Sequence, residues 1–118
     1  MKKILVVDDE VDILAVVKII LSNHNFDVET VSRWENISQT VESYNPDLIL
    51  LDVSLGGADG RDICKTLKST KATENIPVIL FSARYDLVHD LKGCKPNAVL
   101  KKPFESSTLV NIIQGNLN

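Results

Sequence analysis

The chain has 118 residues, of which 44% are hydrophobic and 25% charged, with a formal net charge of −3, and this length suits one domain over residues 1–118. Lysine and arginine form no basic block, which argues against direct nucleic-acid binding. No apolar run approaches the ~20 residues of a membrane span and no signal segment opens the chain, so we expect a cytoplasmic protein.

Strand and helix patterns alternate along the chain. Apolar runs predict strands near residues 3–8, 26–31, 47–52, 77–82 and 97–101. Helical spacing of apolar residues predicts helices near 10–23, 34–44, 60–70, 86–92 and 104–115. This order predicts an α/β fold with a doubly wound, five-stranded parallel sheet and five helices on its two faces.

The second strand pattern, 26–31, alternates apolar and polar residues, whereas the other four are almost continuously apolar. Alternation fits an edge strand with one wetter face, and continuous runs fit strands buried on both faces. A flavodoxin-like strand order, 2-1-3-4-5, satisfies both patterns. It places strands 1 and 3 side by side at the switch point, where doubly wound folds bind ligands.

The first predicted helix is apolar nearly all round. Its inner stripe is expected to be Ile13, Val16, Val17 and Ile20. A second stripe consists of Val11, Leu14 and Ala15. Because Lys18 lies in the middle of the second stripe, we assign that stripe to the outer surface. These outer residues either cover the margin of the sheet or form a docking face for a partner helix.

Charged residues stand where three of the apolar strands end: Asp8 and Asp9 after the first, Asp52 at the end of the third and Lys102 after the fifth. Parallel strands bring their carboxyl ends to one edge, so three carboxylates and one ammonium should converge there. Two carboxylates ~4 Å apart repel by about 4 kcal/mol at an effective dielectric of about 20, so the cluster needs a cation. Carboxylate oxygens and water suit Mg²⁺, and Mn²⁺ can substitute.

A metal ion and a lysine on opposite sides of a phosphoryl group would hold its oxygens, and phosphoryl transfer needs little beyond positioning and charge neutralisation. We expect Asp52, free of the lysine, to be the nucleophile. Ser82 ends the fourth strand, where its hydroxyl can donate to a third phosphoryl oxygen. Taken singly, such residues have ordinary explanations: Asp9 could cap the first helix, and Asp59 with Gly60 fits the turn into the third.

Five short segments follow one another in a fixed order: residues 4–10, 46–52, 59–60, 77–83 and 102–104. Together they resemble, over the whole chain, the receiver domain of two-component response regulators. The resemblance implies that Asp52 is the phosphoacceptor and that Mg²⁺ is held by Asp8, Asp9, Asp52 and the backbone carbonyl of Ser54.

The resemblance also implies that Ser82 is the family's switch hydroxyl and Lys102 its phosphate-contacting lysine. Lys101 is adjacent, but the family's lysine directly precedes proline, which favours Lys102. The Lys102–Pro103 bond is typically cis in this family, although only about 5% of such bonds are cis in folded proteins.

By the same resemblance, a sensor histidine kinase or a histidine phosphotransfer protein donates a phosphoryl group to Asp52. The added charge of about −2 then draws Ser82 inward and changes a partner-binding face. Such a domain is a signalling module that phosphorylates and dephosphorylates itself, and not a turnover enzyme. Its output protein is unknown, a phosphorylation-dependent dimer fits the family, and the chain is either a stand-alone regulator or a receiver cut from a larger protein.

Three positions depart from the family pattern. Val99 stands where an aromatic residue usually reports the state of the switch hydroxyl. Residues 93–97 replace a stretch of small residues, which we expect to stiffen or reshape that loop. Gly56 stands where proline is common, which we expect to loosen the loop after Asp52. Separately, Arg84 lies two residues beyond Ser82, and we hypothesise that it shields or pairs with the phosphoryl group and so slows its hydrolysis.

Two other functions compete with the signalling module. A binding scaffold with a receiver fold that works without phosphorylation is supported by Val99 and opposed by the acidic pocket. A flavin carrier or small phosphatase fits less well. Residues 8–10 would repel a flavin phosphate, and Ser54 stands where such phosphatases have a second aspartate.

Overall fold

The computed structural model describes residues 1–84 and 89–117. Five parallel strands form one sheet in the order β2-β1-β3-β6-β7, which is the predicted order 2-1-3-4-5 when these strands are counted along the chain. Their bounds are β1 Lys3–Val7, β2 Asp27–Val31, β3 Leu48–Asp52, β6 Val78–Ser82 and β7 Ala98–Lys101. Every predicted strand is confirmed to within one residue at each end, and the alternating strand β2 lies at an edge.

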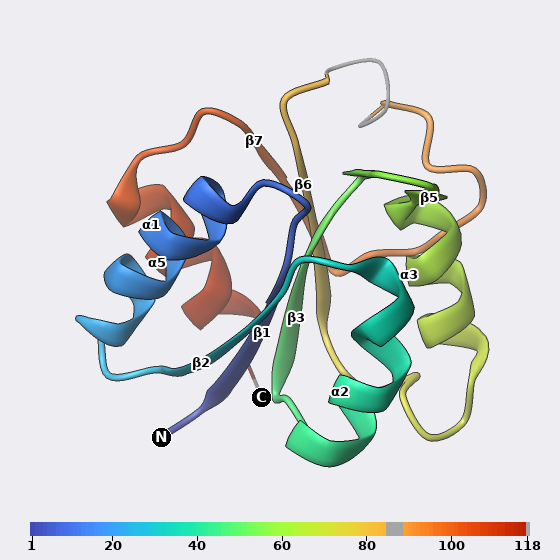
Figure 1. Ribbon diagram of the computed structural model, residues 1–118, viewed down its shortest axis with the longest axis horizontal. Coiled ribbons are helices and arrows are strands. Elements are labelled where there is room, and N and C mark those ends of the chain that lie inside the picture. The colour runs from blue at the N-terminus through green and yellow to red at the C-terminus, as the bar shows by residue number, and fades with distance from the viewer. Residues whose placement is uncertain (85–88, 118) are drawn as a thin grey trace.

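Helices cover both faces of the sheet, α1 and α5 on one side and α2 and α3 on the other (Figure 1). The helical bounds are α1 Val11–Ser22, the short 3₁₀ helix η1 Trp34–Asn36, α2 Ile37–Tyr44, α3 Gly60–Ser69 and α5 Ser106–Asn116. The described residues hold four α-helices where five were predicted. The remaining one, predicted near 86–92, overlaps positions 85–88, which lie outside the described residues. No described helix has the length and apolar character needed to cross a bilayer.

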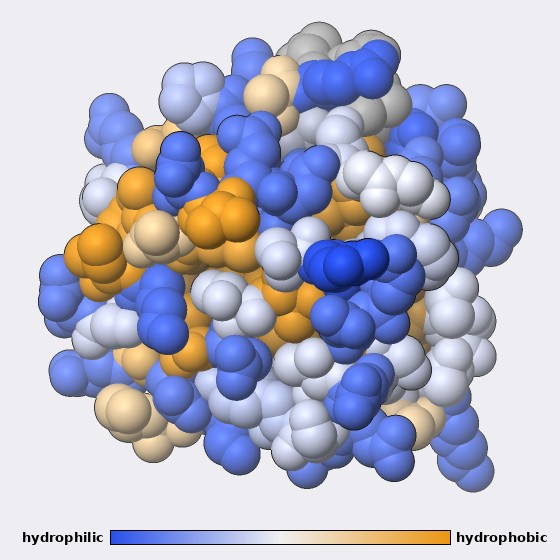
Figure 2. Space-filling model, in the orientation of Figure 1, coloured by the Kyte–Doolittle hydropathy of each residue, from blue (hydrophilic) through white to orange (hydrophobic). Residues whose placement is uncertain are grey.

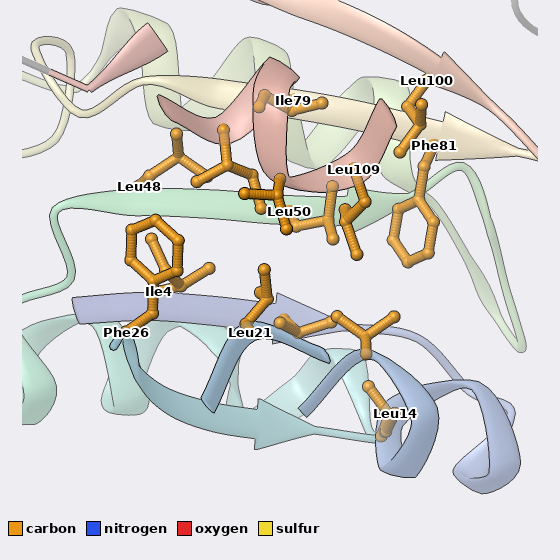
Figure 3. Close-up of a cluster of buried hydrophobic side chains, with 14 residues drawn as sticks. Ile4, Leu14, Leu21, Phe26, Leu48, Leu50, Ile79, Phe81, Leu100 and Leu109 are labelled. Atoms are coloured by element: carbon orange, nitrogen blue, oxygen red, sulfur yellow. The ribbon is translucent and has the colours of Figure 1, made fainter. Parts of the chain in front are cut away.

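The sheet has a separate hydrophobic cluster on each face. In β1, Ile4 and Val6 point into the cluster beneath α1 and α5, whereas Leu5 and Val7 point into the cluster beneath α2 and α3. This alternation follows from the two-residue period of a strand. Figure 3 shows the first cluster, with side chains from the strands meeting those of the two helices. Burial on both faces explains why the strand patterns are continuously apolar.

The assignment of the two stripes on α1 is wrong in part. Leu14, predicted to face outward, is only 5% exposed, and Val16, predicted to face inward, is 54% exposed. The buried line is Leu14, Val17 and Leu21 at spacings of three and four residues. Because apolar residues occur all around this helix, their pattern does not fix its rotation, which is set instead by how the side chains pack on the sheet.

An apolar surface remains on the outer side of α1. Val11, Val16 and Ile19 are each more than half exposed, and we call these three residues the α1 face. Figure 2 shows hydrophobic side chains gathered over this helix, whereas the side of the molecule that carries α2 and α3 is mostly hydrophilic. Contiguous apolar side chains at a surface commonly mark an interaction site.

Candidate functional site

At the carboxyl edge of the sheet, an ammonium group lies between two buried carboxylates. Lys102 Nζ donates to Asp8 Oδ2 at 2.7 Å and lies 3.5 Å from Asp52 Oδ1. Asp8 directly follows β1, and Asp52 ends the neighbouring strand β3. Lys102 directly follows β7, at the far edge of the sheet. Three distant parts of the chain thus bring their charged side chains together, as the strand order predicts.

One detail differs from the prediction, because Asp52 is not free of the lysine. The Lys102 side chain is only 10% exposed, and its ammonium lies over the Phe81 ring, 4.4 Å from the ring centroid. Two buried carboxylates on neighbouring strands repel each other strongly, and a cation between them lowers the energy of both. Strand ends predict which groups meet at an edge, but not which of them form a direct contact.

Burial dominates the protonation of Asp52. Loss of hydration and the nearby Asp8 carboxylate raise the pKa of Asp52 to about 7. The Lys102 ammonium and a hydrogen bond from the Ser54 backbone N–H oppose this rise in pKa. The Asp52 carboxyl group therefore changes charge near neutral pH, which marks it as a candidate reactive group.

Carboxylate oxygens of Asp8, Asp9 and Glu10 come within 4.8 Å of one another. Asp9 does not cap α1; its carboxylate instead accepts a hydrogen bond from the Gly56 N–H at 3.2 Å, and the N-cap residue is Glu10. Such an all-oxygen donor set with exposed members fits Mg²⁺, which keeps several waters. Glu10 was not predicted as a site residue, although its position next to two aspartates is a signal in the sequence.

The loop after Asp52 is a short antiparallel hairpin that was not predicted. Its strands are β4 Ser54–Leu55 and β5 Ala58–Asp59, and Gly57 in the turn has φ of +86°. Only glycine adopts that conformation at little cost. The hairpin holds the Ser54 backbone beside Asp52 and the Gly56 N–H beside Asp9.

Ser82 is buried at the end of β6, the strand next to β3. Its Oγ accepts a hydrogen bond from the Arg84 N–H at 3.0 Å. Arg84 lines an open cavity of about 460 Å³ together with Asp9, Ser54 and Arg61. The serine and the arginine singled out in the sequence are thus both placed at the carboxyl edge.

A buried arginine near this cavity was missed in the sequence. Arg61 is 5% exposed, and its guanidinium contacts the Asp59 carboxylate through Nε and, at 2.6 Å, through NH2. This contact holds the pKa of Asp59 well below its usual range. Asp59, predicted only to lie in the turn into this helix, is the N-cap of α3, because its side chain accepts from the Arg61 N–H. Arg61 donates further to the Asp90 carbonyl, and so ties residues 90–92 to the start of α3.

The segment before β7 is held by buried contacts. Cys94 is 4% exposed, and its thiol lies close enough to the buried thiol of Cys64 on α3 to contribute to the raised pKa of Cys64. The Asn97 side chain accepts from the Val78 N–H at 2.9 Å, and the Asn97 N–H donates to the Val78 carbonyl at 2.8 Å. The Lys102–Pro103 peptide bond, just after β7, is cis, as the family resemblance implies.

A family model for the response regulator receiver domain matches residues 4–114. The chain is 30% identical over 118 residues to the DNA-binding response regulator MtrA of Mycolicibacterium paratuberculosis, covering 98% of this chain and 51% of MtrA. It is 36% identical over 105 residues to the alkaline phosphatase synthesis transcriptional regulatory protein PhoP of Bacillus subtilis, covering 87% of this chain and 43% of PhoP. The chain thus spans about half the length of these relatives.

Solved structures share the fold. The response regulator TrrA of Thermotoga maritima, in complex with Mg²⁺-BeF, has a TM-score of 0.90 at 27% identity, covering 99% of this chain and 100% of that chain. Chemotaxis response regulator CheY4 of Vibrio cholerae has a TM-score of 0.90 at 24% identity, covering 99% of each chain. The likeness to CheY4 shows the fold alone, and it confirms the flavodoxin-like prediction.

The family match covers nearly the whole chain, and the described site lies within the matched residues. Neither finding favours a scaffold that works without phosphorylation. The chain belongs to the response regulator receiver domain family, the phosphoacceptor signalling modules of two-component systems.

Proposed function

We propose that Asp52 is the residue that accepts the phosphoryl group, and that a sensor histidine kinase or a histidine phosphotransfer protein donates it. The observation that carries this proposal is the position of Lys102 Nζ, 2.7 Å from Asp8 and 3.5 Å from Asp52. A lysine between the two carboxylates supplies the positive charge that a transferring phosphoryl group needs beside its nucleophile.

The transfer is a direct displacement at phosphorus. A carboxylate oxygen of Asp52 forms a bond to phosphorus while the bond from phosphorus to the imidazole nitrogen breaks, and the released imidazole takes up a proton. In the later hydrolysis, water attacks phosphorus, the bond to Asp52 breaks, and phosphate leaves with the carboxylate restored. The domain acts on its own side chain in this scheme, so it is a signalling partner and not a turnover enzyme.

A divalent cation belongs to the proposed site, with Mg²⁺ as the first choice and Mn²⁺ as a substitute. Asp8, Asp9, Asp52 and the backbone carbonyl of Ser54 would hold it, and Glu10 contributes a further carboxylate close by. A bound cation would neutralise charge on the phosphoryl oxygens. The site of TrrA, whose structure is a complex with Mg²⁺-BeF, supports this assignment by likeness.

Lys102 and Ser82 would contact the phosphoryl oxygens. The Ser82 hydroxyl, which now accepts from the Arg84 N–H, can turn its own proton toward a phosphoryl oxygen. Movement of Ser82 would then be passed to β7, because Ser82 is paired in register with Lys101 and its carbonyl accepts from the Lys102 N–H at 2.9 Å. Val99 on β7 would respond by packing, since it has no ring to rotate.

The α1 face suits docking of the donor protein. Val11 is 67% exposed and begins the helix that directly follows the acidic residues 8–10. A helix of the donor seated on Val11, Val16 and Ile19 would bring its phosphohistidine near Asp52. We therefore favour a docking role for the α1 face, of which only Val11 belonged to the stripe predicted to face outward, Val11, Leu14 and Ala15.

The output partner is not determined by these residues. MtrA is named as a DNA-binding protein and PhoP as a transcriptional regulatory protein, and both names describe chains about twice as long. We keep the prediction that this domain itself does not bind nucleic acid, because its net charge is −3. Phosphorylation-dependent pairing of two copies remains part of the proposal.

The deciding experiment is incubation with Mg²⁺ and acetyl phosphate, followed by intact mass spectrometry. We expect one phosphoryl group on the wild-type chain and none on Asp52→Asn. EDTA should abolish the modification. Equal modification of both proteins, or none of either while both are folded, would remove Asp52 from this role and favour the scaffold.

A further inference from the structure

A second and larger hollow lies between α2 and α3, which are neighbours on one side of the sheet (Figure 1). Its volume is about 800 Å³, and we call it the α2–α3 groove. Its floor is made of the apolar side chains Ile37, Val41, Ile63, Leu67 and Ile76. A hollow of this size and apolar character is within the range that proteins use for binding.

The edges of the groove are acidic. Its lining includes the four acidic residues Glu35, Glu42, Asp59 and Asp62, and no lysine or arginine from the described part of the chain. This contrast with the apolar floor points to an occupant that is apolar on one side and positively charged at its flanks.

Two of the four carboxylates already have cationic neighbours. Asp59 is engaged by Arg61 and Lys92, and Glu35 lies 3.7 Å from a guanidinium nitrogen of Arg33. Glu42 on α2 and Asp62 on α3 are exposed and face the groove from opposite sides. Glu42 and Asp62 therefore supply most of the negative charge that is available to a bound partner.

The shape of the groove fits a helix. The helices that form its walls have 8 and 10 residues, which corresponds to lengths of about 12 and 15 Å. An added helix of two to three turns could lie along them, with apolar side chains at i, i+3 or i+4, and i+7 in contact with the floor. Lysine or arginine on its flanks would then meet Glu42 on one side and Asp62 on the other.

One end of the groove reaches the hairpin beside the phosphoacceptor site. Trp34 lines the groove and is 38% exposed. Its Nε1 lies 3.2 Å from the position that a Cβ on Gly57 would occupy. Half-exposed tryptophan is a frequent anchor at protein interfaces, and this one borders the hairpin whose Gly56 holds Asp9.

We propose that the α2–α3 groove is an interaction surface for a basic amphipathic helix of a partner protein. The proposal goes beyond phosphorylation and does not depend on it, since the groove exists without a phosphoryl group. Its surface is also distinct from the α1 face, which lies across the sheet.

The test uses a displayed library of helical peptides of about 14 residues, with apolar residues at helical spacing and variable charge on the flanks. Trp34 is the chain's only tryptophan, so its emission reports on the groove directly. We expect enriched peptides to be basic, to shift Trp34 emission on binding, and to bind Asp52→Asn as well as wild type.

Two variants separate the groove from general electrostatic attraction. In the double variant Glu42→Lys/Asp62→Lys, affinity should fall by about tenfold or more, whereas Asp12→Lys/Glu29→Lys, with the same change of charge elsewhere, should bind nearly as wild type. Thr66→Phe fills the groove from an exposed position and should also abolish binding, with folding checked by circular dichroism.

Three results would overturn the proposal: no peptide enriched, enriched peptides that are acidic, or binding that leaves Trp34 emission and the Glu42→Lys/Asp62→Lys affinity unchanged. Because Asp52→Asn is expected to bind normally, failure of this proposal and failure of phosphorylation give different results.

Discussion

Gly60 packs so closely against Asp52 that a Cβ on residue 60 would lie 2.1 Å from the Asp52 carbonyl oxygen. The same Cβ would lie 2.9 Å from the Asp52 carbonyl carbon and from Val53 Cα. The Gly60 N–H in turn donates to the Val53 carbonyl at 2.8 Å. The first residue of α3 is therefore fitted against the main chain that carries the proposed phosphoacceptor.

Replacing this glycine by alanine should be costly. In Gly60→Ala, the start of α3 must move away from the backbone of Asp52 and Val53. We expect this to lower the free energy of unfolding by about 2–3 kcal/mol. We also expect phosphorylation by acetyl phosphate to be slower. Urea unfolding measures the first effect. Gly115→Ala in α5 is the matched control, since a Cβ there meets nothing within 4 Å, and it should be neutral or stabilising by up to about 1 kcal/mol. Similar losses in both variants would contradict the argument.

The raised pKa of Asp52 predicts how stability depends on pH. The folded chain keeps the Asp52 proton up to about pH 7, whereas an unfolded aspartate loses it near about pH 4. Between these values the folded state binds more protons, so stability should fall as pH rises from about 4 to about 7. Asparagine does not titrate, so the stability of Asp52→Asn should not fall in this way over the same pH range.

Urea unfolding of wild type and Asp52→Asn across this pH range provides the measurement. At pH 8 without metal, Asp52→Asn should be more stable by about 1–3 kcal/mol, and at pH 4 the two should agree. A difference that is the same at both pH values would show that protonation of Asp52 is not its cause.

Lys102 should be essential to stability when the acids are charged. Lys102→Met leaves Asp8 and Asp52 buried without their cation, and we expect a loss of about 3–5 kcal/mol at pH 8. The loss should shrink at pH 5, because a proton can replace the ammonium on Asp52. The exposed Lys18 on α1 offers a control, and Lys18→Met should change stability by no more than about 0.5 kcal/mol. Equal effects of the two substitutions would mean that the buried ion pair contributes little.

Mg²⁺ should stabilise the folded chain. Saturating Mg²⁺ is expected to add about 1–3 kcal/mol to the free energy of unfolding at pH 8, because the ion binds only the folded state. Asp9→Ala should lose most of this gain, whereas Asp12→Ala, an exposed acid on α1 outside the cluster, should keep it. Thermal melts with and without EDTA measure the effect. Retention of the full gain in Asp9→Ala would place the ion elsewhere.

Arg84 should prolong the life of the acyl phosphate. Arg84 lines the cavity beside Asp9 and Ser54, where we expect water to approach the phosphoryl group. Alanine preserves the backbone N–H that donates to Ser82. We expect Arg84→Ala to hydrolyse about fivefold faster, equivalent to about 1 kcal/mol of barrier. The decay of phosphorylated protein, followed by intact mass, measures this rate, with Arg33→Ala as a control outside the cavity. An unchanged lifetime would remove Arg84 from the mechanism.

The sheet could be predicted closely because four of its five strands are nearly continuous apolar runs, three of which end at charged residues. Residues 48–52 illustrate this, since four leucine or isoleucine residues precede Asp52 and all five are buried. The meeting of Asp8, Asp52 and Lys102 at one edge follows from parallel strands alone.

Other features could not be predicted because local sequence does not encode them. The rotation of α1 depends on packing, since its apolar residues lie on every side. The hairpin 54–59 has only two residues in each strand, too few to give a period. The Arg61–Asp59 contact and the closeness of Gly60 to Asp52 arise only when α3 packs against the sheet. In the sequence, Asp59 and Gly60 indicate only a turn.

The two clusters on opposite sides of the sheet have a consequence for evolution. The strands alternate their side chains between them, and each cluster draws its helical residues from different helices. Mutational drift in α2 and α3 can therefore be compensated within their own half of the molecule, leaving the packing of α1 and α5 as it was. The surface formed by α2 and α3 can therefore change to bind a new partner while the surface formed by α1 and α5 keeps its existing one.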